Sequence, residues 1–118
     1  MKLSYEGIGQ WAATFVCDDL AEGELVKVSA NGTVAACAAG DDFCGMVLSV
    51  GRGGDACAVA LGGMVTAGYT VPAEGAAPAL GWSGLSADGE GGVQADADGS
   101  TYLVVDVDTT AKTVTFVL

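Results

Sequence analysis

The segment from residue 94 to residue 99 has the spacing most suggestive of chemistry in this chain, because Asp96 and Asp98 alternate and a glycine follows them. This x-D-x-D-G pattern is typical of calcium loops, whose carboxylates coordinate the ion. An EF-hand also needs an acid at its first position, a glutamate near its twelfth and a helix on each side. Gln94 and Val105 occupy those two positions, and the flanking residues alternate like strands. The sequence therefore predicts an Asx-rich turn and no metal site.

Two acidic doublets, Asp18 with Asp19 and Asp41 with Asp42, are the next candidates. A general acid/base pair needs burial and a cleft that brings two carboxylates together. Carboxylates at strand ends more commonly accept hydrogen bonds from the amides of turns. The chain also has no histidine, which is the commonest general base. We therefore predict no catalytic residue and a protein that is not an enzyme.

Four cysteines are candidates for a disulfide, a zinc site or a nucleophile. Each lies within or beside an apolar run: Cys17, Cys37, Cys44 and Cys57. No pair has C-x-x-C spacing, and without histidine a zinc ion would need all four thiolates. A nucleophilic cysteine would need a histidine or another cation nearby to lower its pKa. The pattern favours buried free thiols, with disulfides as the alternative, and no cofactor is expected.

Aromatic residues offer a third kind of site, a surface that stacks on sugars or contacts another protein. Tryptophan and tyrosine occur at Tyr5, Trp11, Tyr69, Trp82 and Tyr102. Aromatics in small β proteins more often pack in or around a core. Trp82 follows a stretch rich in proline, alanine and glycine, which favours an exposed ring. Tyr69 and Trp82 are therefore predicted as possible surface aromatic contacts.

Composition limits the classes of function. The net charge of −11 and the four scattered basic residues argue against direct binding of nucleic acid. Hydrophobic residues make up 51% of the 118 residues, which indicates a folded chain. No stretch approaches the roughly 18 apolar residues that cross a bilayer, and the first residues lack the apolar core of a signal peptide. We expect synthesis and folding in a cytoplasm, with no membrane partner.

Glycine and Asx residues divide the chain into short apolar runs that alternate like strands. The sequence predicts strands at residues 11–17, 24–29, 33–37, 43–50, 56–61, 64–69, 82–87, 92–95, 101–107 and 113–118. Residues 71–80 are predicted to form a surface loop, and helical signals are confined to residues 20–24. This pattern predicts an all-β fold, either a small β-barrel or a sandwich of short antiparallel strands. We divide it into an N-terminal arm at 1–10 and a single β domain at 11–118.

Local patterns add sharper predictions. Asn31-Gly32 between two strands predicts a type I′ hairpin, since both residues tolerate a positive φ. Strict alternation along a strand predicts shared faces. The residues placed on one face are Met46, Leu48 and Val50 in one strand and Leu103, Val105 and Val107 in another, with Tyr102, Val104 and Asp106 on the opposite face of the latter.

The order of several segments resembles a known group of proteins. A glycine-acidic turn precedes a strand with Val26 and Val28, and later come Phe43-Cys44-Gly45-Met46-Val47, Ala60-Leu61-Gly62-Gly63 and Met64-Val65-Thr66. A Val93-Gln94 strand and the closing hairpin complete the series. From about Glu24 to Leu118, the chain resembles the capsid decoration or head-fibre-like proteins encoded near the major capsid gene of tailed phages and prophages. These motifs are patterns of strands rather than catalytic signatures.

The resemblance implies a compact β-barrel-like domain on the outside of a capsid lattice, often a homotrimer, that stabilises the head against internal DNA pressure. It implies the major capsid protein as the partner, with no active site and no obligatory cofactor. It also implies a place on the virion exterior after synthesis in the cytoplasm of a bacterial host. Some members engage capsid subunits through an N-terminal arm. On that basis Tyr5, Ile8 and Trp11 are possible capsid-binding residues.

Two other functions compete with this hypothesis. A carbohydrate- or cell-surface-binding β module displayed on a virion would present exposed aromatics with carboxylates around Trp82 or Tyr69. A small cysteine-dependent enzyme would require one thiol with a lowered pKa. The composition and the resemblance together favour a non-enzymatic decoration protein.

Overall fold

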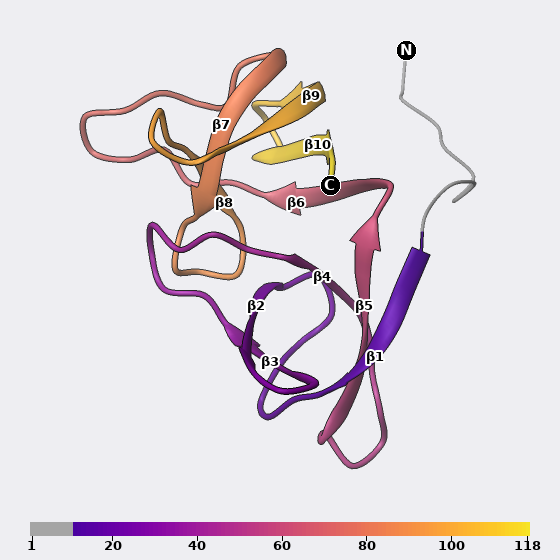
Figure 1. The fold of residues 1–118 in the computed structure, drawn as a ribbon. Helices are drawn as coiled ribbons and strands as arrows, with labels where there is room; N and C mark the ends of the chain where they lie inside the picture. The colour runs from indigo at the N-terminus through magenta and orange to yellow at the C-terminus, as the bar shows by residue number, and fades with distance from the viewer. Residues whose placement is uncertain (1–10) are drawn as a thin grey trace.

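The computed structural model describes residues 11–118 of the chain. Ten β-strands and no helix occur in this part (Figure 1). The strands are β1 (Trp11–Val16), β2 (Leu25–Ala30), β3 (Thr33–Ala36), β4 (Gly45–Val50), β5 (Ala56–Gly62), β6 (Met64–Gly68), β7 (Gly81–Ala87), β8 (Val93–Ala95), β9 (Ser100–Asp108) and β10 (Thr113–Val117). Every predicted strand is present, with its ends within two residues of the prediction. The prediction of an all-β fold is confirmed.

The first five strands form a closed barrel in the order β1-β3-β2-β4-β5. Neighbouring strands are antiparallel except β1 and β3, which meet through one parallel pair, Val16 with Thr33. The seam between β1 and β5 runs from Trp11 opposite Gly62 to Val16 opposite Ala56. The core of this barrel consists of small apolar side chains: Cys17, Val26, Val34, Val47, Cys57 and Val59.

The last five strands form a second sheet in the order β6-β10-β9-β7-β8, with antiparallel neighbours throughout. This sheet curls back on itself, because Tyr69, which follows β6, forms a parallel bridge with Val93 of β8. The N–H of Thr70 also donates to the Val93 carbonyl at 2.9 Å. The architecture is therefore a closed barrel joined to a second, strongly curved sheet.

A larger core lies between the two sheets. Phe43 stacks on Tyr102 with ring centroids 5.0 Å apart, and Phe116 meets both rings edge-on at 5.8 and 5.5 Å. Phe43 precedes β4 of the barrel, whereas Tyr102 and Phe116 belong to the second sheet. Such aromatic pairs stabilise a core beyond the area that they bury. The contact ties the two sheets together.

Adjacent residues of β4 enter the two different cores. Met46 packs in the core between the sheets, and Val47 packs inside the barrel. The register between β4 and β5 then shifts between Val47 and Ser49, so that Leu48 is an extra, exposed residue. Such a β-bulge changes which face the following residues occupy. The prediction that Met46, Leu48 and Val50 share one face is therefore wrong.

A second bulge corrects the prediction for β9. Thr115 lies opposite Asp106, but Phe116 lies opposite Val104, so Val105 is the extra residue. Tyr102 and Val104 face the core before the bulge, and Val107 packs against the same core after it. The inward face is thus set by the bulge rather than by strict alternation of the sequence.

The hairpin at Asn31-Gly32 joins β2 and β3 as predicted, but its turn differs from the prediction. Gly32 has a φ of +62°, whereas Asn31 does not have a positive φ. The register between β2 and β3 also shifts between Val28 and Ala30. A type I′ turn needs positive φ at both central residues. The observed geometry resembles a turn followed by a glycine bulge, so the type I′ prediction is wrong.

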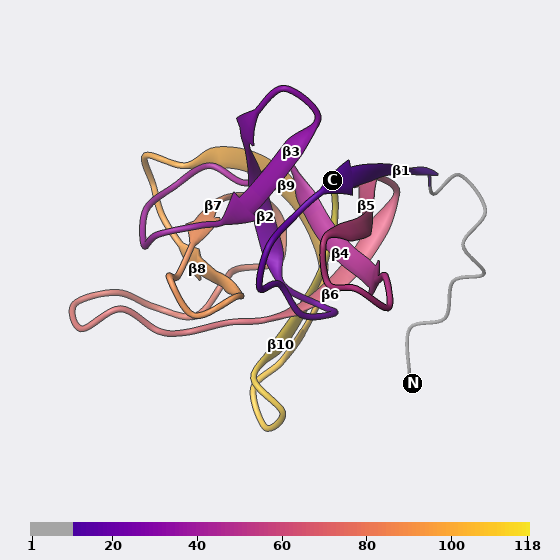
Figure 2. The ribbon, with the colours of Figure 1, turned by 90° about the horizontal axis from the view of Figure 1, so that it is seen from below.

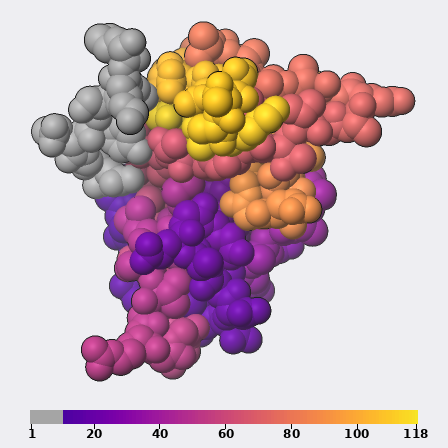
Figure 3. Space-filling model, turned by 180° about the vertical axis from the view of Figure 1, so that it is seen from behind, coloured from indigo at the N-terminus to yellow at the C-terminus, as the bar shows by residue number. Residues whose placement is uncertain are grey.

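Two loops project from the molecule. Residues 71–80 form the surface loop predicted between β6 and β7, and Figure 2 shows this loop extending away from both sheets. The loop between β4 and β5 projects from the other end, as the view from behind shows (Figure 3). Residues 20–24, the one predicted helical signal, form no helix, and residues 22–23 form a turn. No helix of the described residues is long and apolar enough to cross a membrane.

Candidate functional site

The outer face of the second sheet, which points away from both cores, carries a row of apolar side chains. Trp82 of β7 lies opposite Leu103 of β9, and Leu103 lies opposite Val117 of β10. Residues directly opposite each other in an antiparallel sheet share one face, so these three side chains lie side by side. We call Trp82, Leu103 and Val117 the apolar row.

Trp82 is the most exposed large hydrophobic residue of residues 11–118, with 74% of its surface accessible. Its neighbour Leu80 is 67% exposed. Gly81 between them has a φ of +90°, which turns the chain sharply into β7. The Ser83 hydroxyl donates to the Ala79 carbonyl at 2.8 Å and fixes the end of the loop. A defined turn therefore precedes Trp82, whose side chain is exposed to solvent.

The charged residues on the strands of this face are all acidic. Among β6, β7, β9 and β10, only Asp106 and Asp108 carry a charge. The Asp108 carboxylate accepts the N–H groups of Thr110 and Ala111, each at 3.0 Å, and so fixes the turn to β10. Asp106 lies opposite Thr115, whose hydroxyl is 2.8 Å from that of Thr66. The outer face thus combines an apolar end with a polar, acidic end.

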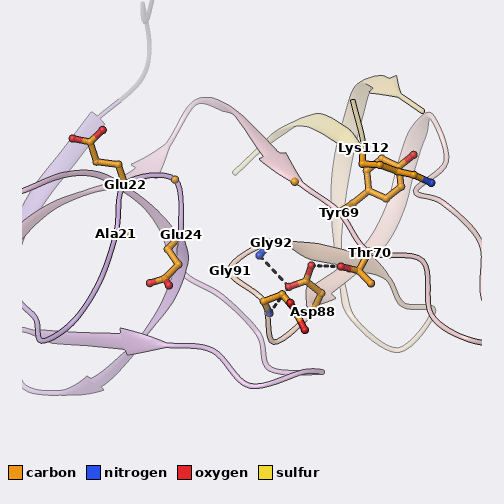
Figure 4. Close-up of a pocket in the computed structure, with 12 residues that line it drawn as sticks. Ala21, Glu22, Glu24, Tyr69, Thr70, Asp88, Gly91, Gly92 and Lys112 are labelled. Carbon is orange, nitrogen blue, oxygen red and sulfur yellow. Dashed lines mark hydrogen bonds between the residues drawn. The ribbon is translucent and has the colours of Figure 1, made fainter. Parts of the chain in front are cut away.

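An open pocket of about 420 Å³ lies where the loop before β2 meets the loop between β7 and β8 (Figure 4). The charged residues that line it are Glu22, Glu24, Asp88, Glu90 and Lys112. Asp88 is committed to structure, since its carboxylate accepts the N–H groups of Glu90 and Gly92 at 2.7 and 3.0 Å. Its other oxygen accepts the Thr70 hydroxyl at 2.8 Å. The pocket can attract cations, but Asp88 mainly holds its own loop.

Two polar atoms beside this pocket have no hydrogen-bond partner among residues 11–118. They are Oε2 of Glu24 and the hydroxyl of Tyr69, and both are buried. Figure 4 shows the Tyr69 ring beside Lys112, with its hydroxyl directed away from Asp88 and Thr70. The Lys112 ammonium lies 5.7 Å from the centre of that ring, within the range of a cation–π contact. Glu24 and Tyr69 both line the pocket, and their unpartnered atoms are buried.

The structure separates the aromatic residues predicted to lie at the surface. Trp82 is exposed on the outer face, as predicted, but Tyr69 is only 6% exposed and belongs to the core between the sheets. The prediction of a surface contact at Tyr69 is therefore wrong, because the residue after β6 turns inward to bridge β8. The two rings form no common platform.

Of the residues predicted for a capsid-binding arm, the structure describes one, Trp11. Tyr5 and Ile8 lie outside the described residues, and so does the predicted arm at 1–10. Trp11 starts β1, where its indole lies over Gly62 of β5 and is 59% exposed. Trp11 is thus a surface residue of the barrel wall.

The acidic motifs act within turns. The Asp96 carboxylate accepts the N–H of Asp98 at 2.9 Å, which confirms the Asx turn. Hydrogen bonds from Ser86 and from this N–H lower the pKa of Asp96. Asp41 forms an ion pair with Lys27 at 2.6 Å, and that hydrogen bond is the main reason why its pKa is lowered. Residues 11–118 contain no cluster of three or more acidic or cysteine side chains suited to a metal ion.

All four cysteines are free thiols, as predicted, with Cys17 and Cys57 buried and Cys37 and Cys44 half-buried. Burial raises the pKa of Cys57 to about 11, and a hydrogen bond with Cys17 adds to the effect. Burial, followed by the charge of Asp41, raises the pKa of Cys37 to about 11. Burial also raises the pKa of Cys44. These three thiols are thus held in the protonated form, which is the less reactive one.

Comparison with models of known protein families finds no match, and comparison with curated proteins finds none either.

The apolar row is the feature that sequence reasoning missed, apart from its residue Trp82. Alternation correctly predicts that Leu103 faces away from the side of β9 that carries Tyr102 and Val104. Its cross-strand neighbours, however, depend on the register. The available signal was the shared alternation of β9 and β10, which the bulge at Val105 interrupts.

Proposed function

We propose that this chain is a capsid decoration protein of a tailed phage or prophage. It binds the outer surface of the head, contacts the major capsid protein and stabilises the lattice without catalysing a reaction. The order of its strand motifs and its all-β fold support this proposal. The observation that carries it is the apolar row, because an exposed tryptophan beside other apolar side chains is typical of a surface that another macromolecule covers.

The proposal includes a homotrimer on the virion exterior, assembled in the cytoplasm of a bacterial host. Exposed apolar residues on the barrel, Val16 and Val28, are each more than half exposed and offer surface for contacts between copies. Light scattering over a dilution series measures the mass of the assembly. A trimer that persists on dilution would support this part, and a strict monomer would limit trimer formation to the lattice.

The function is tested with empty heads assembled from the major capsid protein of the phage or prophage that encodes this chain. We expect the purified chain to sediment with the heads at a fixed number of copies per capsid. We also expect it to raise the temperature at which the empty heads dissociate. Absence of co-sedimentation at saturating concentration would contradict the function.

A carbohydrate-binding module is the second candidate, and the exposure of Trp82 supports it as well. Sugar sites combine an aromatic ring with polar groups that bond the hydroxyls. The cross-strand neighbour of Trp82 is Leu103, and Gly84 follows on the same face, so polar groups are sparse around the ring. Quenching of Trp82 fluorescence by oligosaccharides, with no binding to heads, would favour this candidate.

A further inference from the structure

The outer face of the second sheet carries an apolar surface that is only partly covered, since Trp82 is exposed while Leu103 and Val117 are half-buried. The opposite face of the same strands fills the core, with Phe116 fully buried and Val104 and Val114 nearly so. Trp82, Leu103 and Val117 cannot join that core, because their register places them on the other side of the sheet. The core beneath the sheet therefore does not remove their apolar area from water, and a molecule that covers the outer face would do so.

The charges of this face indicate what kind of molecule covers it. Asp106 is exposed beyond the apolar row, and β6, β7, β9 and β10 contribute no basic residue. The nearest cation in the chain order, Lys112, lies over the ring of Tyr69. With a net charge of −11, the whole protein favours a positively charged partner surface. A matching surface would have an apolar centre with lysine or arginine beside it.

We propose that the apolar row and Asp106 form the docking surface for the capsid, and that the capsid meets them with an apolar patch flanked by basic side chains. This inference rests on the proposed function and names the surface that performs it. Trp82 supplies the central contact, since tryptophan buries a large area at small entropic cost and is enriched among residues that dominate binding. Asp106 sets the orientation through charge.

A second copy of the chain fits this face less well. Each copy would bring Asp106 and Asp108 to the interface, and neither copy has a cation on these strands to pair with them. Buried carboxylates without a partner cation strongly oppose association. Contacts between copies are therefore expected elsewhere, on the barrel.

The two tryptophans of the chain provide a matched test. Trp82→Ala removes the proposed contact, whereas Trp11→Ala removes an indole that is also exposed but lies on the barrel. The affinity of each variant is measured on empty heads assembled from the major capsid protein of the phage or prophage that encodes this chain. Far-UV circular dichroism checks that each variant is folded. We expect Trp82→Ala to weaken binding by about 30-fold and Trp11→Ala to leave it within about threefold of wild type.

Single-tryptophan variants report which face becomes covered. In Trp11→Phe the only tryptophan is Trp82, and in Trp82→Phe it is Trp11. On addition of heads, we expect the emission of Trp82 to shift to shorter wavelength and to become protected from acrylamide. The emission of Trp11 is expected to stay unchanged.

Asp106→Asn tests the charge of the partner. We expect about threefold weaker binding at low salt and a smaller dependence of binding on salt than in wild type. Binding that strengthens in Asp106→Asn would contradict a basic partner surface and overturn the inference.

The outcomes separate the inference from the function. If heads bind the wild type and Trp82→Ala equally well, the docking surface is wrong and the decoration function stands. If no head binds the wild type, the function fails and the inference falls with it. If light scattering detects a dimer or trimer that Trp82→Ala abolishes, a second copy occupies the face and the inference is overturned.

Discussion

The indole of Trp11 occupies the space beside Gly62 on the neighbouring strand, where any side chain on Gly62 would overlap the ring. The pair stands at the end of the seam that closes the barrel between β1 and β5. Glycine is favoured here by the close approach of the ring and not by backbone conformation, since Gly62 does not have a positive φ. The ring in turn covers backbone that glycine leaves bare.

Gly62→Ala is therefore expected to displace Trp11. The ring is 59% exposed and can move, so we expect the free energy of unfolding to fall by only about 1 kcal/mol. The measurement is the fluorescence of Trp11 in a Trp82→Phe background, where emission is expected to shift to longer wavelength. Unchanged emission would show that the ring does not lie over Gly62.

Gly45→Ala is expected to be far more damaging. A Cβ at Gly45 would overlap the Ala60 carbonyl oxygen and approach a methyl group of Val59, and neither the backbone nor the packed core can yield. We expect a loss of about 3 kcal/mol in urea unfolding. Gly68→Ala is the matched control, since its nearest neighbour would be the Lys112 carbonyl at 3.9 Å. An equal loss in both variants would contradict the explanation by space.

Tyr69→Phe is expected to preserve or raise stability. The Tyr69 hydroxyl is buried without a partner in the part of the chain that the structure describes, so its removal relieves a desolvation cost of about 1 kcal/mol while the ring keeps its contact with Lys112. Tyr102→Phe serves as the control, because the hydroxyl of Tyr102 has a hydrogen bond with Ser100 to lose. Thermal unfolding compares the two. Destabilisation by Tyr69→Phe would reveal a partner for its hydroxyl.

The raised pKa values of Cys37 and Cys57 predict a loss of stability at alkaline pH. The pKa of each thiol is about 11 in the folded protein against 9.0 ordinarily, so the unfolded chain releases protons first as pH rises. The contribution of the thiols is complete below pH 9.0 and disappears between pH 9.0 and about 11.

The double variant Cys37→Ala, Cys57→Ala isolates this effect from other groups that titrate in the same range. Urea midpoints are measured for both proteins from pH 7.5 to 10.5. We expect the stability advantage of the wild type to shrink as pH rises. An advantage that stays constant over this range would mean that the thiols titrate alike in the folded and unfolded chains.

Strand positions were accessible from sequence, whereas faces were accessible only in part. Alternation and glycine punctuation located each strand to within two residues. The bulges at Leu48 and Val105 could not be foreseen, since they arise from pairing between distant strands. The Asn31-Gly32 turn was located, but its type differs because the register between β2 and β3 shifts between Val28 and Ala30.

The candidate site followed the same division. The exposure of Trp82 was predictable from the proline- and glycine-rich loop before it. Tyr69 was misplaced because its burial depends on a bridge to Val93, a residue in another part of the chain. Leu103 and Val117 became part of the surface only through the register of β7, β9 and β10.

The placement of Met46 and Val47 in different cores has a consequence for cooperativity. One strand, β4, is a wall shared by the barrel and by the core beneath the second sheet. If β4 detaches, both cores lose packed side chains at once. The barrel and the second sheet are therefore not expected to unfold independently. Residues 11–118 are therefore expected to unfold as one thermodynamic unit. A change that destabilises the sheet carrying Trp82 is expected to destabilise the barrel as well.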